Sequence, residues 1–213
     1  MSICLTGSHR SGKTTLARAF AQYEGIPFVQ TTASAVFESL GLSPSETLTM
    51  SKRLLVQRKI LEEFERLYRS AKSRVFITDR SPIDLIGYTM VEIGQKPIGA
   101  KNERELYKYI DDCIDVLNRH FSTIVIVSPA IPLVAEEGKA SLSKPFIDHL
   151  AYVLEGVCAM PNITAGTFRI PRKMIDLSDR VQSLSLLVDN QLKSYQENIT
   201  YLGEQEGKPV VFH

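Results

Sequence analysis

The sequence predicts an α/β fold, a three-layer sandwich in which a mainly parallel sheet of about five strands has helices on both faces. Short apolar runs alternate along the chain with longer segments whose apolar residues recur at helical spacing. This alternation is typical of parallel strands joined by helices. The length of 213 residues suits a single domain over residues 1–213, with room for a small inserted lid.

Five apolar runs are predicted as strands because they are compact and bounded by turn residues or polar residues. They lie at 3–5, 27–32, 75–78, 123–127 and 163–170. The run 123–127, Thr-Ile-Val-Ile-Val, is the clearest of them. The run 75–78 has the character of a buried strand that ends at Asp79.

Seven segments between and after these strands carry helical spacing or helix-end signals. They lie at 16–21, 33–40, about 45–71, 81–94, 102 to about 120, 145–158 and 178 to about 198. Ser81 is expected to cap its helix, with Pro82 in the first helical position. Residues 128–144 show no clean periodicity and hold two prolines, so we predict that they form the lid.

Composition narrows the class of protein. A hydrophobic fraction of 44% and a charged fraction of 23% are ordinary for a soluble globular enzyme, and the formal net charge of +1 gives no overall basic field for nucleic acid. The three cysteines are too far apart for a disulfide framework or a zinc site, which favours a reduced, cytoplasmic setting. We expect no signal peptide and no membrane span, because no apolar run approaches about 20 residues.

The segment Gly7 to Thr15, GSHRSGKTT, follows the first predicted strand and precedes the first helix. It fits the phosphate-binding pattern G-x-x-x-x-G-K-[ST], in which glycines let backbone N–H groups turn toward a phosphate. We expect Lys13 to reach the β- and γ-phosphates of ATP and the Thr14 hydroxyl to ligate Mg²⁺. The predicted ATP-binding residues are Gly7, Ser8, His9, Arg10, Ser11, Gly12, Lys13, Thr14 and Thr15.

A second signal follows the strand 75–78. Asp79, at the tip of a central strand, could help to hold Mg²⁺ or take a proton from an attacking hydroxyl. Arg80 could clamp a phosphate with two parallel hydrogen bonds. The competing interpretation is an Asp-Arg pair that caps the strand and forms a surface salt bridge.

Both motifs resemble those of the P-loop nucleoside and nucleotide kinases. The loop with Arg10 in its middle is similar to that of certain thymidylate kinases, and Asp79-Arg80-Ser81 is similar to the acid-Arg-Ser motif of deoxynucleoside kinases. The run 76–84 also resembles phage and bacterial AAA-type ATP-binding proteins related to nicotinamide riboside kinase. The motif departs from the Asp-Arg-aromatic motif of thymidylate kinases in one place, because no aromatic residue follows Arg80, and thymidylate itself is therefore not the expected acceptor.

The resemblance implies a P-loop NTPase fold and transfer of the γ-phosphoryl group of ATP, with Mg²⁺, to a nucleoside, nucleotide or related acceptor. In that family a loop arginine accompanies a lid poor in arginine, and residues 128–144 hold Lys139 and Lys144 but no arginine. Arg10 is therefore a candidate for stabilising the transferred phosphoryl group. The expected catalytic residues are Lys13, Arg10, Asp79 and Arg80, with Thr14 and Asp79 at the metal.

The acceptor side is less defined. Arg53 and Gln57 lie one turn apart on the third predicted helix and could meet an acceptor, as could Arg80, Lys139 and Lys144. The competing interpretation is a solvated helix face and two lysines that only aid solubility.

Two other functions stay open. One is a kinase that acts on a base or an end in nucleic acid, through a local basic groove. The other is a regulatory ATPase or switch, although no Asp-Glu pair ends an apolar strand and no Asn-Lys-x-Asp motif occurs. We expect a small-molecule nucleoside or nucleotide acceptor, with nucleic acid as the alternative, and leave a homodimer open.

Overall fold

A five-stranded parallel sheet forms the centre of the computed structural model, which describes residues 2–43, 46–94, 97–130 and 143–205. The strands are β1 (Ile3–Thr6), β2 (Phe28–Val29), β3 (Ile77–Thr78), β4 (Thr123–Val127) and β5 (Gly166–Ile170). Their order in the sheet is β2-β3-β1-β4-β5, and every neighbouring pair is parallel. The predicted sheet is confirmed, although β2, β3 and β5 are shorter than the sequence suggests.

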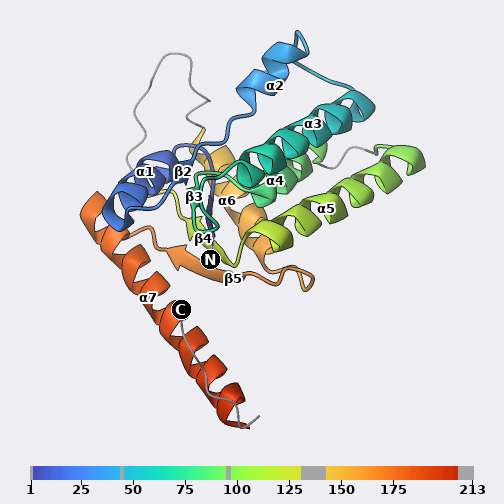
Figure 1. Cartoon of the computed structure of the whole chain (residues 1–213). Coiled ribbons are helices and arrows are strands. Elements are labelled where there is room, and N and C mark those ends of the chain that lie inside the picture. Colours follow the sequence, from blue (N-terminus) through green and yellow to red (C-terminus); the bar gives the residue numbers. More distant parts are fainter. Residues whose placement is uncertain (1, 44–45, 95–96, 131–142, 206–213) are drawn as a thin grey trace.

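Within the residues that the structure describes, seven helices connect and flank these strands (Figure 1). They are α1 (Lys13–Glu24), α2 (Ser34–Ser39), α3 (Met50–Arg69), α4 (Pro82–Ile93), α5 (Ala100–His120), α6 (Lys144–Cys158) and α7 (Leu177–Gln205). Ser81 caps α4 as predicted, with Pro82 in its first turn. The third helix does not begin near residue 45: α3 starts at Met50, because the Thr49 hydroxyl accepts a hydrogen bond from the Lys52 amide and caps it there.

The sheet separates two apolar layers, as the two-residue period of its strands requires. On β1, Ile3 and Leu5 pack with α1 and the start of α7, whereas Cys4 packs with α3, α4, α5 and α6. In Figure 1, α1 and α7 accordingly lie on one side of the sheet and α3, α4 and α5 on the other, and α7 continues well away from the body. The predicted three-layer sandwich is therefore confirmed.

Parallel pairing brings the carboxyl ends of the strands to one edge. β1 pairs with β4 from Ile3 opposite Thr123 to Thr6 opposite Ile126, and with β3 through Cys4 opposite Thr78. The segment after β1 and the residue Asp79 after β3 therefore lie at the same edge of the sheet, where ligands bind in folds of this kind. In the part of the chain that the structure describes, none of the helices is both long and apolar enough to cross a bilayer.

Candidate active site

The loop between β1 and α1 has a tightly constrained backbone. Gly7 has φ 153°, and a Cβ there would lie 2.5 Å from the carbonyl oxygen of Val127 at the end of β4. Gly12, with φ 87°, is the N-cap residue of α1. Arg10 has φ 61° and is the one non-glycine residue with positive φ in the described chain. These positions give the loop a strongly curved path that ends on the positive end of the α1 dipole.

Lys13 lies folded over the loop. Its Nζ donates hydrogen bonds to the carbonyl oxygens of Gly7 at 2.7 Å and Ser8 at 2.8 Å, and the residue is only 8% exposed. Burial lowers the pKa of this ammonium from 10.5 to about 8, although the nearby Asp84 and Asp79 charges oppose that shift. The ammonium could exchange these two carbonyl partners for phosphate oxygens without leaving the loop.

Asp79 joins three segments through its carboxylate and is almost fully buried. Its Oδ2 accepts a 2.7 Å hydrogen bond from the Thr14 hydroxyl in the first turn of α1. Its Oδ1 accepts hydrogen bonds of 3.1 Å from both the amide and the hydroxyl of Thr31, beyond the end of β2. The interpretation of Asp79 as part of a surface salt bridge is wrong, because Thr14 and Thr31 hold this buried carboxylate and it forms no ion pair within the described chain.

Sequence reasoning missed Thr31 by treating it as an ordinary strand residue. The available signal was a hydroxyl residue at the end of a strand that neighbours the one leading to Asp79.

The oxygen atoms in this region suit Mg²⁺ and phosphate. The Thr14 hydroxyl and the Asp79 carboxylate provide two hard oxygen donors within hydrogen-bond distance of each other, and Mg²⁺ prefers such donors. The hydroxyls of Ser8 and Ser11 are buried and make no hydrogen bond within the described chain, which leaves them for phosphate oxygens. The residues present therefore fit both groups.

Arg80 is held through its backbone. Its carbonyl oxygen accepts hydrogen bonds from the hydroxyls of Thr78 at 2.8 Å and Tyr68 at 3.4 Å. The residue is half-buried, its positive charge contributes to lowering the pKa of Lys13, and it forms no ion pair within the described residues. This leaves its side chain available to an anionic group at the edge of the sheet.

Asp84 is a second buried carboxyl near the loop. Its Oδ2 accepts hydrogen bonds from the Ser81 amide at 2.9 Å and the Ser81 hydroxyl at 3.2 Å, which completes a capping box at the start of α4. Burial raises the pKa of Asp84, and the charges of Lys13 and Arg80 act in the opposite direction. Sequence reasoning used this stretch only as a helix start and missed the carboxyl that lies in the field of Lys13.

Arg180 reaches the loop from the opposite end of the chain. It is 1% exposed, its Nε donates to the carbonyl of Met174 at 2.7 Å, and its Nη1 donates to the carbonyl of Ser11 at 3.1 Å. One side chain thus joins the phosphate-binding loop to the segment between β5 and α7. Nothing in the local sequence indicates this contact, because 169 positions separate Arg180 from Ser11.

Arg53 and Gln57 do not form a solvated face, so that interpretation is wrong. Arg53 pairs through Nε with Glu92 of α4 at 2.7 Å, and its side chain is 13% exposed. Gln57 is buried and accepts a 3.4 Å hydrogen bond from the Tyr109 hydroxyl of α5. Arg53 and Glu92 line a pocket of about 500 Å³ between the start of α3 and the end of α4.

The predicted lid is only partly visible. Residues 131–142, including Lys139, lie outside the described chain. Lys144, at the end of the predicted lid, is the first residue of α6 and pairs with Asp148 at 2.8 Å, with its side chain 73% exposed. His9 of the loop lies with its ring centroid 5.6 Å from that of Phe146 in α6.

The sequence profile of a family described as AAA domain matches residues 2–121, which is more than half of the chain. The chain belongs to this AAA domain family. The matched region contains both the loop from Gly7 to Thr15 and Asp79-Arg80. No curated relative matches the sequence.

Solved structures place this AAA domain protein in the fold of the P-loop nucleoside and nucleotide kinases. Deoxyadenosine kinase from M. mycoides with bound dCTP has a TM-score of 0.60 at 13% identity, over 91% of this chain and 100% of that one. Thymidylate kinase from Candida albicans has a TM-score of 0.57 at 13% identity, over 89% and 91%. YorR protein from Bacillus subtilis, in complex with phosphorylated GDP, has a TM-score of 0.54 at 15% identity, over 91% and 98%. At these identities the likeness establishes the fold.

Proposed function

We propose that this protein is an ATP-dependent phosphotransferase that moves the γ-phosphoryl group of ATP to a nucleoside, nucleotide or related small acceptor. The observation that carries the proposal is the hydrogen bond from Thr14 to Asp79. It places the hydroxyl that follows the loop lysine against a carboxylate at the tip of the neighbouring strand. Phosphoryl transfer needs such a hydroxyl and carboxylate beside the transferred group.

Each residue has a distinct part in this reaction. Lys13 binds the β- and γ-phosphate oxygens in place of its present carbonyl partners, and the buried hydroxyls of Ser8 and Ser11 donate to the phosphates. Thr14 and Asp79 would hold Mg²⁺, which supplies neutralisation of charge on the phosphates. We also assign to Asp79 the role of accepting the proton of an attacking hydroxyl, and its position after β3, at the carboxyl edge of the sheet, supports this assignment.

Two arginines complete the proposed site. Arg10 lies within the loop, where a guanidinium can stabilise charge on the transferred phosphoryl group. Arg80 follows Asp79 and would bind a phosphate or hydroxyl of the acceptor with its guanidinium. The two side chains are assigned to opposite partners of the transfer, ATP and acceptor.

A small acceptor is favoured by the pocket that Arg53 and Glu92 line. Its volume of about 500 Å³ lies in the range of small-molecule sites, and Thr89 together with this ion pair offers both donors and acceptors to a polar ligand. Gln57 lies one turn beyond Arg53 on the same helix. An acceptor in nucleic acid and a regulatory ATPase cycle without an acceptor are the two alternatives that the experiment must separate.

The deciding experiment measures ATP consumption and product formation under three conditions. Purified protein with ATP and Mg²⁺ is assayed alone, with a panel of nucleosides and nucleotides, and with single- and double-stranded DNA. Stimulation by a nucleoside or nucleotide, with a phosphorylated product of matching mass, is the expected result. Rapid turnover without an acceptor would favour the ATPase, and stimulation by DNA alone would favour a nucleic acid kinase.

A further inference from the structure

A second pocket opens at the edge of the sheet opposite the phosphate-binding loop. It has a volume of about 570 Å³. Its wall includes Ser2, Phe76 and Ser122, the residues that come directly before β1, before β3 and before β4. Because the strands are parallel, their amino ends share one edge, and the candidate active site lies at the other. This pocket is therefore separate from the site proposed above.

Cationic side chains dominate the wall of this pocket. Arg69 lies in the last turn of α3, and Arg119 lies in the last turn of α5. Lys72 and Arg74 lie in the connection between α3 and β3. Lys72 and Arg74 are exposed and take part in no ion pair within the described chain. The whole protein has a formal net charge of only +1, so this concentration of positive charge is a local feature.

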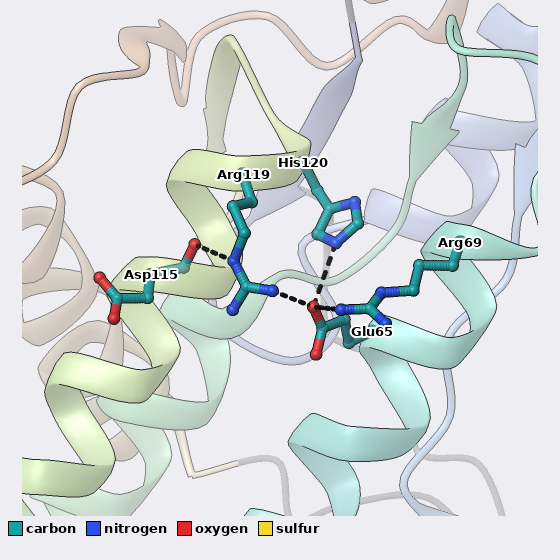
Figure 2. Close-up of polar contacts among 5 residues, drawn as sticks. All are labelled: Glu65, Arg69, Asp115, Arg119 and His120. Atoms are coloured by element: carbon teal, nitrogen blue, oxygen red, sulfur yellow. Dashed lines mark hydrogen bonds and ion pairs between the residues drawn. The ribbon is translucent and has the colours of Figure 1, made fainter.

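One carboxylate, Glu65, partly compensates these charges (Figure 2). Its Oε1 pairs with Arg69 Nη2 at 2.7 Å and with Arg119 Nη1, and His120 Nε2 lies 3.5 Å from the same oxygen. Burial opposes ionisation of Glu65, but the hydrogen bonds and charges around it outweigh that effect and hold its pKa below the ordinary value. Burial lowers the pKa of His120, although the neighbouring Glu65 carboxylate acts in the opposite direction.

Asp115 does not add a second compensating charge. Figure 2 shows its carboxylate pointing away from the cluster, and its contact with Arg119 runs from Nε to the backbone carbonyl of Asp115 at 3.3 Å. Arg69 and Arg119 each donate one hydrogen bond to the same oxygen atom of Glu65. Each guanidinium therefore keeps further N–H groups that make no hydrogen bond within the described chain.

Helix ends explain only part of the cluster. Arg69 and Arg119 occupy the last turns of α3 and α5, where cations are favoured by the helix dipole. That reason does not extend to Lys72 and Arg74, which lie beyond the end of α3. Their presence around the same hollow leaves an excess of positive charge that neither the helix ends nor Glu65 accounts for.

We propose that this pocket binds a small phosphate-bearing anion, independently of the phosphate-binding loop. Guanidinium groups match the geometry of phosphate oxygens, and Lys72 adds a mobile point charge. Three packed rings also line the pocket: the ring centroid of Tyr68 lies 4.8 Å from that of Phe121 and 6.1 Å from that of Phe76. These rings are almost fully buried, so the cationic side chains of the pocket lie beside an apolar part of the core, where attraction between charges is stronger than in bulk water.

The test is calorimetric titration of Lys13→Ala protein, in which the loop has lost its phosphate-binding ammonium. Inorganic pyrophosphate and AMP are the two probes, at low ionic strength. We expect saturable binding of at least one probe, and its removal or a weakening of at least about tenfold when Lys72→Glu and Arg74→Glu are added. The tighter of the two probes shows whether the ligand is an inorganic phosphate or a nucleotide.

The matched control is Lys101→Glu with Lys108→Glu, which makes the same charge change on exposed positions of the first half of α5. It should leave binding within about twofold. Circular dichroism and thermal melting check that each variant is folded. Absence of binding by both probes at millimolar concentration, or equal losses in the two double variants, would overturn the proposal. Neither result bears on phosphoryl transfer, which wild-type protein tests separately.

Discussion

Thr14 and Asp79 lie 65 positions apart in the chain, and the hydroxyl of the first donates a 2.7 Å hydrogen bond to the carboxylate of the second. This bond connects the start of α1 to the end of β3 across the ligand edge of the sheet. Thr31 fixes the other carboxylate oxygen through its amide and hydroxyl. Two segments of the chain therefore fix the orientation of this carboxylate, as the proposed phosphoryl transfer requires.

Replacing Asp79 by Asn tests the charge of this carboxylate. The amide keeps the shape and one acceptor oxygen for Thr31 but removes the negative charge needed at the metal and for the proton. We expect kcat to fall about 10²-fold or more, with ATP affinity largely kept. Steady-state kinetics and ATP titration measure the two effects. Asp148→Asn, on the surface of α6, is the control, and an unchanged rate in Asp79→Asn would contradict the assignment.

Arg10 is expected to act in the transition state. Arg10→Asn removes the guanidinium while tolerating the positive φ of 61°, so it separates charge from backbone strain. Arg10→Met provides the same charge loss with a long apolar side chain. Both variants should lower kcat and kcat/KM together by about a hundredfold, with little change in ATP affinity. Lys144→Ala should have a small effect, because Lys144 pairs with Asp148 on the surface. If the Arg10 variants lost ATP affinity but kept kcat, the assignment of Arg10 to the transition state would be wrong.

The pKa of Lys13 gives a prediction for pH dependence. Because burial lowers this pKa to about 8, the free protein loses the ammonium charge above pH 8. ATP affinity should therefore weaken between pH 8 and 10, by at most about tenfold per pH unit. Lys13→Arg keeps its charge over this range, so its profile should be flat. ATP affinity is measured by titration at constant ionic strength. If the ATP affinity of wild-type protein did not change over this pH range, the prediction that the Lys13 ammonium binds the phosphates and loses its charge near pH 8 would be wrong.

The same shift has a consequence for stability. The unfolded chain, with a lysine pKa near 10.5, binds more protons than the folded chain between pH 8 and 10.5. The contribution of Lys13 to the free energy of unfolding should therefore rise with pH across that window. Comparing denaturant unfolding of wild-type and Lys13→Met protein at pH 7.5 and 10 measures it. An identical difference at both pH values would contradict the lowered pKa.

Arg180 should position the phosphate-binding loop without touching the reacting atoms. Arg180→Met removes the hydrogen bonds to the carbonyls of Ser11 and Met174 and leaves both acceptors unpaired in a buried site. We expect ATP affinity to fall about tenfold and amide exchange in the loop to accelerate, with a smaller change in kcat. Arg172→Met is the control, because Arg172 is an exposed arginine that pairs with Asp148. Unchanged exchange in the loop would show that Arg180 only fills space.

The sequence predicts the fold well because its signals are local. A run of consecutive β-branched residues identifies β4, and the Ser81-Pro82 pair marks the start of α4. The start of α3 was misplaced because it depends on a single hydroxyl, Thr49, and several residues before it also suit a helix. Short strands such as β2 were overextended because only part of each apolar run pairs with a neighbour.

In the candidate site, too, the sequence predicts the residues that belong to local motifs and misses those that act through distant contacts. The loop and Asp79 could be found because each follows a strand within a short motif. Thr31, Asp84 and Arg180 could not, since their roles arise from contacts between segments that are distant in the chain. Arg53 and Gln57 were proposed from helical spacing, which identifies a shared face but does not show that it packs against α4 and α5.

Phosphoryl transfer by this protein is tested most directly by following labelled phosphate from [γ-³²P]ATP to a panel of nucleosides and nucleotides, with wild-type and Lys13→Ala protein in parallel. With the wild-type protein we expect a labelled acceptor whose formation requires Mg²⁺. In Lys13→Ala, whose folded state is checked by circular dichroism, this product should fall by at least about a hundredfold. Near wild-type turnover of ATP by folded Lys13→Ala protein would contradict the assignment of this loop as the site of phosphoryl transfer.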